Sequence, residues 1–272
     1  SFGSFQPVDQ KPSFTLDFTR FGGTIGFRGL QKIHLNNSAE DPSFLNELVG
    51  ADCFRAVGIP APRISYALVE LNGRKLGLYV LKEGFTRDFL RRNFDNADGT
   101  LYETDREIQK EHIDLDRFLT FIAMEVLICH RDGYCLAGNN FRIYLDSARR
   151  QTTFLPAGMD QVFGKPDYPL ELSMTGEFAR TVISSPAGKL GFLSKLRDLY
   201  SVCEPSRLNG QIDSTLALLK RELPRRDFGS IKTAAGDLKA RISRRYQFLE
   251  NKLEPASLEG PVLATANNIK PD

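Results

Sequence analysis

The sequence contains no tryptophan, and sulfur-containing and imidazole side chains are scarce: three Met, four Cys and three His occur among 272 residues. The cysteines stand at positions 53, 129, 135 and 203 and form no C-x-x-C pair, so neither a disulfide framework nor a zinc ribbon is indicated. Cys129 and His130 are adjacent, and no second pair has the spacing of a zinc finger. The sequence therefore gives no reason to expect a structural metal.

An excess of one charge is also missing, because 36 basic residues balance 34 acidic ones and the formal net charge is +2. This balance gives no electrostatic reason to expect nucleic acid or a strongly anionic membrane as a partner. No apolar run approaches the length of a membrane span. The chain begins at Ser1 without a methionine, which favours a processed or trimmed product, and the compartment is left open.

The first 84 residues have the pattern of a sheet with one helix. We expect strands over 14–19 and 27–36, joined by the glycine-rich turn RFGGTIG. A helix is predicted next, with Asp41 as its N-cap, Pro42 in its first turn and Gly58 at its end. Residues 62–83 alternate on both sides of Asn72-Gly73, which predicts a hairpin with a two-residue turn.

The pattern becomes mainly helical from Thr86 onward. A long apolar helix over 115–128, preceded by Asp114, leads into the loop CHRDGYCLAGNN. The segments NFRIYLD and TTFLPAGMD then form a second predicted hairpin around SARRQ. Two further helices are predicted over 207–223 and 230–253, and a linker or disordered tail over 254–272. The chain is thus expected to divide into domains 1–84 and 85–253, followed by the tail 254–272.

The second hairpin brings several polar residues together. An antiparallel pair places the residue entering its first strand beside the residue leaving its second, so Asn139 and Asn140 are expected near Asp160. An amide and a carboxylate suit magnesium, and Asp132 is then placed to orient or deprotonate a hydroxyl nucleophile. The alternative is structural: Asp132 caps a turn with Gly133, and the asparagines are turn residues.

The order of the predicted elements is that of a protein-kinase catalytic core, and particular motifs make the similarity more specific. They are KIHLNN with Asp41, the segment GIPAPRISYALVELNGRKLGLYVLKE, GTLY, HRDGYCLAGNNFRIY and FLPAGMDQVFG, which together cover residues from about 26 to 165. On these motifs the sequence resembles the CotH kinase family, the atypical kinases related to spore coat protein H. The last hundred residues show a helical pattern only.

The resemblance implies a two-lobed α+β fold like that of atypical protein kinases, with an antiparallel sheet and one helix in the N-lobe and a mainly helical C-lobe. It implies ATP and Mg²⁺ or Mn²⁺ as cofactors, and transfer of a phosphoryl group to a serine of a coat or secreted protein. An extracytoplasmic or spore-surface location follows from the same resemblance. The implied roles are Asp132 as catalytic aspartate, Asn140 and Asp160 as metal ligands, and Lys32 as the residue that holds the nucleotide phosphates.

One segment departs from the family pattern. Where the family usually reads Trp-Asp-x-Asp, this chain reads AGMD, so Ala157 and Gly158 replace an aromatic side chain and a carboxylate. Two alternatives to protein phosphorylation therefore stay open. The first is transfer of AMP instead of a phosphoryl group, and the second is a nucleotide-binding pseudokinase or interaction module.

Four other charged residues have candidate roles. Arg28 is a weaker candidate than Lys32 for contacting phosphate, and Glu83 stands where a kinase hinge begins, so it either contacts the nucleotide or caps the connector. Glu47 projects almost opposite the apolar stripe of its helix, which predicts a solvated position. A literal Asp-Phe-Gly motif begins at Asp227, but it precedes a long helix, so a helix cap or first-turn anion is predicted there.

Overall fold

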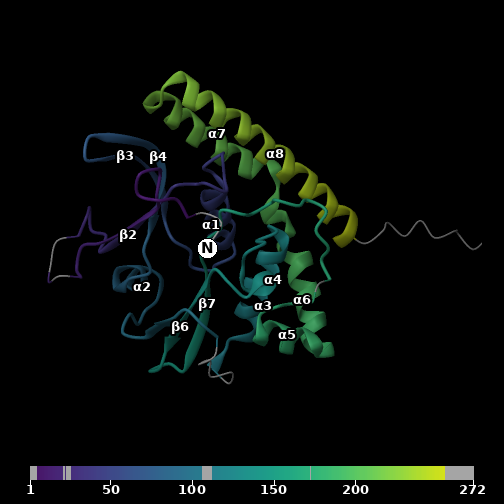
Figure 1. Ribbon diagram of the computed structural model, residues 1–272. Helices are drawn as coiled ribbons and strands as arrows, with labels where there is room; N and C mark the ends of the chain where they lie inside the picture. Colours follow the sequence, from purple (N-terminus) through teal and green to yellow (C-terminus); the bar gives the residue numbers. More distant parts are fainter. Residues whose placement is uncertain (1–4, 21, 23–25, 106–111, 172, 255–272) are drawn as a thin grey trace, which may run out of the picture.

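The computed structural model describes residues 5–20, 22, 26–105, 112–171 and 173–254 of the chain. A four-stranded antiparallel sheet lies on one side of the molecule and most of the helices lie on the other, with a long helical pair across the top of the view (Figure 1). The predicted α+β class with an antiparallel sheet is confirmed. Its two-lobed, kinase-like arrangement stays a prediction.

The four-stranded sheet has the order β1-β2-β4-β3. Its strands are β1 (Phe14–Asp17), β2 (Lys32–Asn36), β3 (Ile64–Leu71) and β4 (Arg74–Glu83). The hairpin predicted at Asn72-Gly73 is confirmed, since both residues have the positive φ angles, 51° and 77°, that such a turn requires.

The first two strands are shorter than predicted. β1 ends at Asp17 because its carboxylate accepts hydrogen bonds from the Thr19 amide at 3.1 Å and from the Thr19 hydroxyl at 3.0 Å, which turns the chain. β2 begins only at Lys32, because Phe27 and Leu30 pair with each other around a tight turn. The glycine-rich turn predicted between the strands lies partly outside the described residues.

Helix α1 (Asn46–Ala56) begins later than the sequence indicates. The Asp41 carboxylate accepts hydrogen bonds from the backbone amides of Ser43, at 3.0 Å, and Asn46, at 2.8 Å, so Asp41 holds a turn ahead of the helix. Burial raises the pKa of this carboxyl group. The predicted end is confirmed, because Gly58 follows the helix with φ of 76°.

The rest of the chain contains a second sheet and most of the helices. The strands β5 (Thr100–Tyr102), β6 (Phe141–Asp146) and β7 (Gln151–Pro156) form a sheet in that order, and the predicted second hairpin is confirmed. Asp114 caps α3 as predicted by accepting a hydrogen bond from the Arg117 amide at 3.1 Å. The helices are α2 (Arg87–Asn93), α3 (Leu115–Leu127), α4 (Tyr134–Ala137), α5 (Glu177–Ser184), α6 (Pro186–Leu199), the 3₁₀ helix η2 (Tyr200–Cys203), α7 (Pro205–Glu222) and α8 (Arg225–Leu253).

Both C-terminal helices that the sequence predicts are present, and each begins a few residues earlier than expected. They lie side by side in Figure 1. Asp227 occupies the first turn of α8, as the prediction of a first-turn anion requires. The predicted tail lies, apart from Glu254, outside the described residues. No described helix combines the length and apolar character that crossing a membrane requires.

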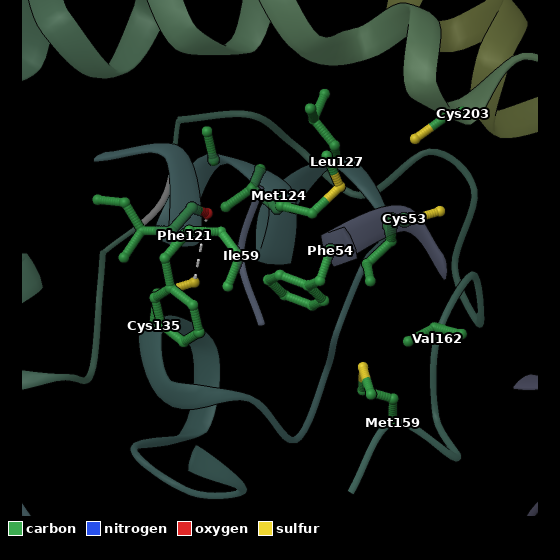
Figure 2. Packing of buried hydrophobic residues seen from close by; sticks show 14 of the residues in the cluster. Cys53, Phe54, Ile59, Phe121, Met124, Leu127, Cys135, Met159, Val162 and Cys203 are labelled. Atoms are coloured by element: carbon green, nitrogen blue, oxygen red, sulfur yellow. Dashed lines mark hydrogen bonds between the residues drawn. The ribbon is translucent and has the colours of Figure 1, made fainter. Parts of the chain in front are cut away.

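One large apolar core joins elements from both predicted lobes. Phe54 of α1 and Phe121 of α3 are fully buried, with ring centroids 5.7 Å apart, and Figure 2 shows them among Ile59, Met124 and Leu127. The same cluster continues to buried residues of α7 and α8. The helix of the predicted N-lobe is therefore packed directly on the helices of the predicted C-lobe.

Candidate functional site

A cavity of about 320 Å³ lies where the two sheets and α1 meet. His34 and Asn36 of β2 and Lys82 of β4 line it from the first sheet, and Asp132 and Asn140 line it from the loop before β6. Further lining residues come from β1, from α1 and from the segment after β7: Phe14, Thr15, Glu47, Ala157, Gly158, Met159 and Asp160. The cavity thus receives side chains from both parts of the molecule.

Asp132 is held by two amides of its own loop. Its carboxylate accepts hydrogen bonds from Asn140 Nδ2 at 2.6 Å and from Asn139 Nδ2 at 3.1 and 3.2 Å. Asp132 also lies in the turn that the Gly133 amide closes by donating to the His130 carbonyl at 2.9 Å, so its assignment to catalysis or to the turn stays a prediction. Both oxygens of its carboxylate accept hydrogen bonds from the two asparagine side chains at the cavity wall.

Asp160 follows β7 and lines the same cavity. Its side chain accepts a hydrogen bond from Asn36 Nδ2 at 3.3 Å, and its backbone carbonyl accepts one from Asn46 Nδ2 at 2.6 Å. Burial, and next the negative charge of Glu47, raise the pKa of Asp160 to about 6. A carboxylate with so few compensating partners is suited to a cation.

The donor atoms at this site fit a hard divalent cation. Asn140 donates from its side-chain nitrogen to Asp132, so its Oδ1 atom is the group left to act as a ligand in the cavity that Asp160 also lines. In the described ranges, no group of three or more His, Cys, Asp or Glu residues is arranged to hold a metal. Magnesium is commonly held by one or two carboxylates together with substrate phosphates and water, which matches a set of one carboxylate and one amide.

Gly158 allows the close approach of Asn140 to the segment after β7. The Ala157 amide donates to the Asn140 carbonyl at 2.9 Å, and Gly158 has φ of 53°. A Cβ atom at Gly158 would lie 2.5 Å from Cγ and Oδ1 of Asn140. The glycine in AGMD is therefore required by the packing of Asn140, and a larger residue at this position would need a different arrangement.

The loop that carries Asp132 rests on two buried residues, His130 and Glu125, of which Glu125 was not identified from the sequence. Glu125 of α3 is fully buried and accepts hydrogen bonds from the amides of Tyr134, at 2.9 Å, and Cys135, at 2.7 Å, at the start of α4. His130 Nε2 bonds to the Gly158 carbonyl at 3.1 Å, and a Cβ atom at Gly133 would lie 2.5 Å from Glu125 Oε1. The feature of the sequence that could have identified Glu125 is the position of a glutamate within the mainly apolar helix predicted over 115–128.

A lysine–glutamate pair also lines the cavity, and it corrects the prediction for Glu47. Glu47 is buried, with 2% of its surface exposed, and its carboxylate forms an ion pair with the Lys82 ammonium group. The prediction of a solvated position was wrong because Lys82 of β4 reaches this face of α1 and supplies a charge partner there. Lys82 was not identified as a candidate from the sequence, although the alternation of side chains between the two faces of β4 was the pattern that could have identified it.

The three predicted nucleotide-binding residues occupy different places. Lys32 pairs with Asp17 at 3.2 Å and does not line the cavity. Arg28 is exposed in the turn before β2, with its guanidinium carbon 5.9 Å from the centroid of the Phe27 ring. Glu83 does line the cavity.

Glu83 is held by two arginines. Its carboxylate accepts hydrogen bonds from Arg92 Nη2 at 2.6 Å and from Arg63 Nη2 at 3.2 Å. Burial by itself would raise the pKa of this carboxyl group, but the hydrogen bonds from Arg92 and from the Arg63 amide outweigh burial and lower it. Glu83 therefore stays ionised at the start of the connector to α2.

Comparison with known proteins gives two matches. The family described as "CotH kinase protein" matches residues 2–112. The inner spore coat protein H of Bacillus subtilis (strain 168) is 33% identical over 76 residues, which are 28% of this chain and 21% of that protein. The chain therefore matches about a fifth of the length of this relative. Asp132, Asn140 and Asp160 follow the matched family segment, so their roles depend on the geometry of the cavity.

Proposed function

Because the chain belongs to the CotH family, we propose that it is an ATP- and magnesium-dependent protein kinase that phosphorylates a serine hydroxyl. The observation that carries this proposal is the convergence of Asp132, Asn140 and Asp160 on one cavity that also contains the Lys82–Glu47 pair. Phosphoryl transfer requires positioning and charge stabilisation more than covalent chemistry, and these groups supply both.

Asp132 is the proposed catalytic residue. Its carboxylate is fixed by Asn139 and Asn140, so it can accept a hydrogen bond from the acceptor hydroxyl and then take the proton as the oxygen attacks phosphorus. The Asp160 carboxylate and the side-chain Oδ1 of Asn140 would hold magnesium, which when bound neutralises charge on the phosphate oxygens. The pairing of Asn140 with Asp132 links the metal side of the site to the acceptor side.

Lys82 is the proposed phosphate-binding lysine. Its ion pair with Glu47 fixes an otherwise flexible side chain at the cavity wall, where the ammonium group can contact an anionic ligand. The apolar part of the same cavity, formed by Phe14, Leu35, Pro62 and Phe85, is suited to the adenine base. Since the named relative is a spore coat protein, we propose a coat or secreted protein as substrate and an extracytoplasmic or spore-surface location.

Two substitutions separate the proposed roles. Asp160→Ala should weaken magnesium-dependent ATP binding itself, measured by calorimetry, because it removes the charged ligand. Asp132→Ala should leave that affinity within a few fold while lowering transfer by roughly 10²- to 10⁴-fold, the range of a positioned base. Circular dichroism serves as the folding control. An equal loss of ATP binding in both variants would contradict the assignment of Asp132 to the acceptor.

A pseudokinase is the second candidate, and the observation that favours it is Gly158. The glycine stands where the family pattern has a carboxylate, and the contact with Asn140 leaves no room for a side chain. Incubation with γ-labelled and α-labelled ATP distinguishes the possibilities. Transfer of γ-label supports the kinase, transfer of α-label indicates AMP transfer, and tight magnesium-ATP binding without either product identifies a pseudokinase.

A further inference from the structure

Three strands of the four-stranded sheet place a row of polar side chains along the wall of the cavity. Thr15 of β1 is paired with His34 of β2, and His34 is paired with Lys82 of β4. All three residues line the cavity. Residues directly opposite each other in an antiparallel pair have Cβ atoms about 4.5–5.5 Å apart. The imidazole of His34 is therefore a neighbour of the lysine that is proposed to contact phosphate.

The cavity wall around His34 carries charges of both signs. Three cations act on His34, and each forms an ion pair with a carboxylate. The pairs are Lys82–Glu47, Lys32–Asp17 and Arg142–Glu103. Further acidic residues line the same cavity: Glu83, Asp132 and Asp160. A ligand at this wall is thus selected by directed hydrogen bonds, together with Lys82, and not by an excess of positive charge.

The side chain of His34 is half-buried and uncharged near neutral pH. Burial, and next the positive charges of Lys82, Lys32 and Arg142, lower the pKa of its imidazole to about 4. Its Nδ1 atom is hydrogen-bonded to the Thr15 hydroxyl at 2.9 Å, and within the described ranges Nε2 has no such partner. A neutral imidazole donates from one nitrogen and accepts at the other, so the second nitrogen is left for a ligand.

We propose that the Thr15 hydroxyl donates to His34 Nδ1, and that His34 Nε2 carries the ring proton and donates a hydrogen bond to a phosphate oxygen of the nucleotide bound at Lys82. This inference rests on the proposed kinase function and adds a neutral donor to the phosphate contacts. Phosphate oxygens only accept hydrogen bonds, so the contact requires the proton on Nε2. A hydroxyl group can donate to Nδ1, and Thr15 thus favours this tautomer.

The test compares His34→Phe, which keeps a ring but removes the donor, with His34→Gln, whose side-chain amide retains a donor. Binding of magnesium-ATP, magnesium-tripolyphosphate and adenosine to the full chain is measured by calorimetry. We expect His34→Phe to weaken the two phosphate ligands by roughly tenfold and to leave adenosine within about twofold. His34→Gln should stay within about threefold of the native chain for all three ligands. Thr15→Val should weaken only the phosphate ligands, by a smaller factor than His34→Phe.

The matched control is His112→Phe, because His112 contacts Arg150 and does not line the cavity. It should leave all three affinities unchanged, and circular dichroism confirms that each variant folds. Equal effects of His34→Phe and His112→Phe, or a loss of adenosine affinity as large as that of ATP, would overturn the proposal. Binding is measured without transfer. Selective loss of tripolyphosphate affinity in His34→Phe, when the native chain transfers no γ-label, would uphold the contact and contradict the kinase function.

Discussion

At the scale of single residues, Lys82 of β4 lines the cavity, whereas Lys32 of the neighbouring strand β2 does not. Lys82 is paired with buried Glu47, whereas Lys32 is paired with Asp17 outside the cavity. We predict that Lys82→Ala lowers magnesium-ATP affinity by roughly tenfold or more, because a charge-assisted contact to phosphate is lost. Lys32→Ala is the matched control and should change the affinity by less than about twofold. The opposite ranking in calorimetry would return the phosphate role to Lys32.

Gly158 offers a second test at this scale. Gly158→Ala would place a methyl group 2.5 Å from Asn140 atoms in a backbone conformation with positive φ, so Asn140 must move. We predict weaker magnesium-dependent nucleotide binding and a loss of about 1–3 kcal/mol in the free energy of unfolding. A Cβ atom at Gly164 meets nothing within 4 Å, so Gly164→Ala is the control. Unchanged nucleotide binding in Gly158→Ala would show that the position of Asn140 is not required.

At the scale of elements, the longest helix supports the loop that carries Asp132. Arg245 of α8 is fully buried and donates to the carbonyls of Val126, at 2.7 Å, and Leu127, at 3.0 Å, at the end of α3. It also donates to the carbonyls of Pro166, at 3.1 Å, and Tyr168, at 2.6 Å. One guanidinium group thus joins three segments, and burial lowers its pKa.

We predict that Arg245→Met lowers the free energy of unfolding by about 2–4 kcal/mol, because four carbonyl groups lose their donor in a buried site. The neighbouring Arg244 is exposed, so Arg244→Met should change it by less than about 0.5 kcal/mol. Urea denaturation of both variants gives the comparison. Similar midpoints for the two variants would mean that water replaces the lost donor and that α8 does not support the loop.

At the scale of the whole molecule, the apolar core crosses the predicted boundary at residue 84. Phe54 lies before this boundary and contacts Phe121 after it, within one cluster of buried residues. We predict a single calorimetric transition, which Phe54→Ala shifts to lower temperature as a unit with a cost of about 3–5 kcal/mol. Leu68 is 57% exposed, so Leu68→Ala is the control. A separate low-temperature transition in Phe54→Ala would indicate a sheet that unfolds independently.

Local features of the fold followed from the sequence by itself. The turn at Asn72-Gly73, the cap at Asp114 and the hairpin of β6 and β7 were all predicted, because each depends on conformational preferences of neighbouring residues. The family resemblance was likewise carried by short motifs and is confirmed by the comparisons. Hairpin geometry predicted Asn139 and Asn140 near Asp160, and of these two Asn140 lines the same cavity as Asp160.

The tertiary structure decided which charged side chains face the cavity. Helical projection placed Glu47 in solvent, but it is buried and paired with Lys82 of β4. Glu125 and Arg245 are buried because backbone donors and acceptors from segments far apart in sequence surround them. Burial and pairing of a charge depend on what other elements supply, and a single segment of sequence does not contain that information.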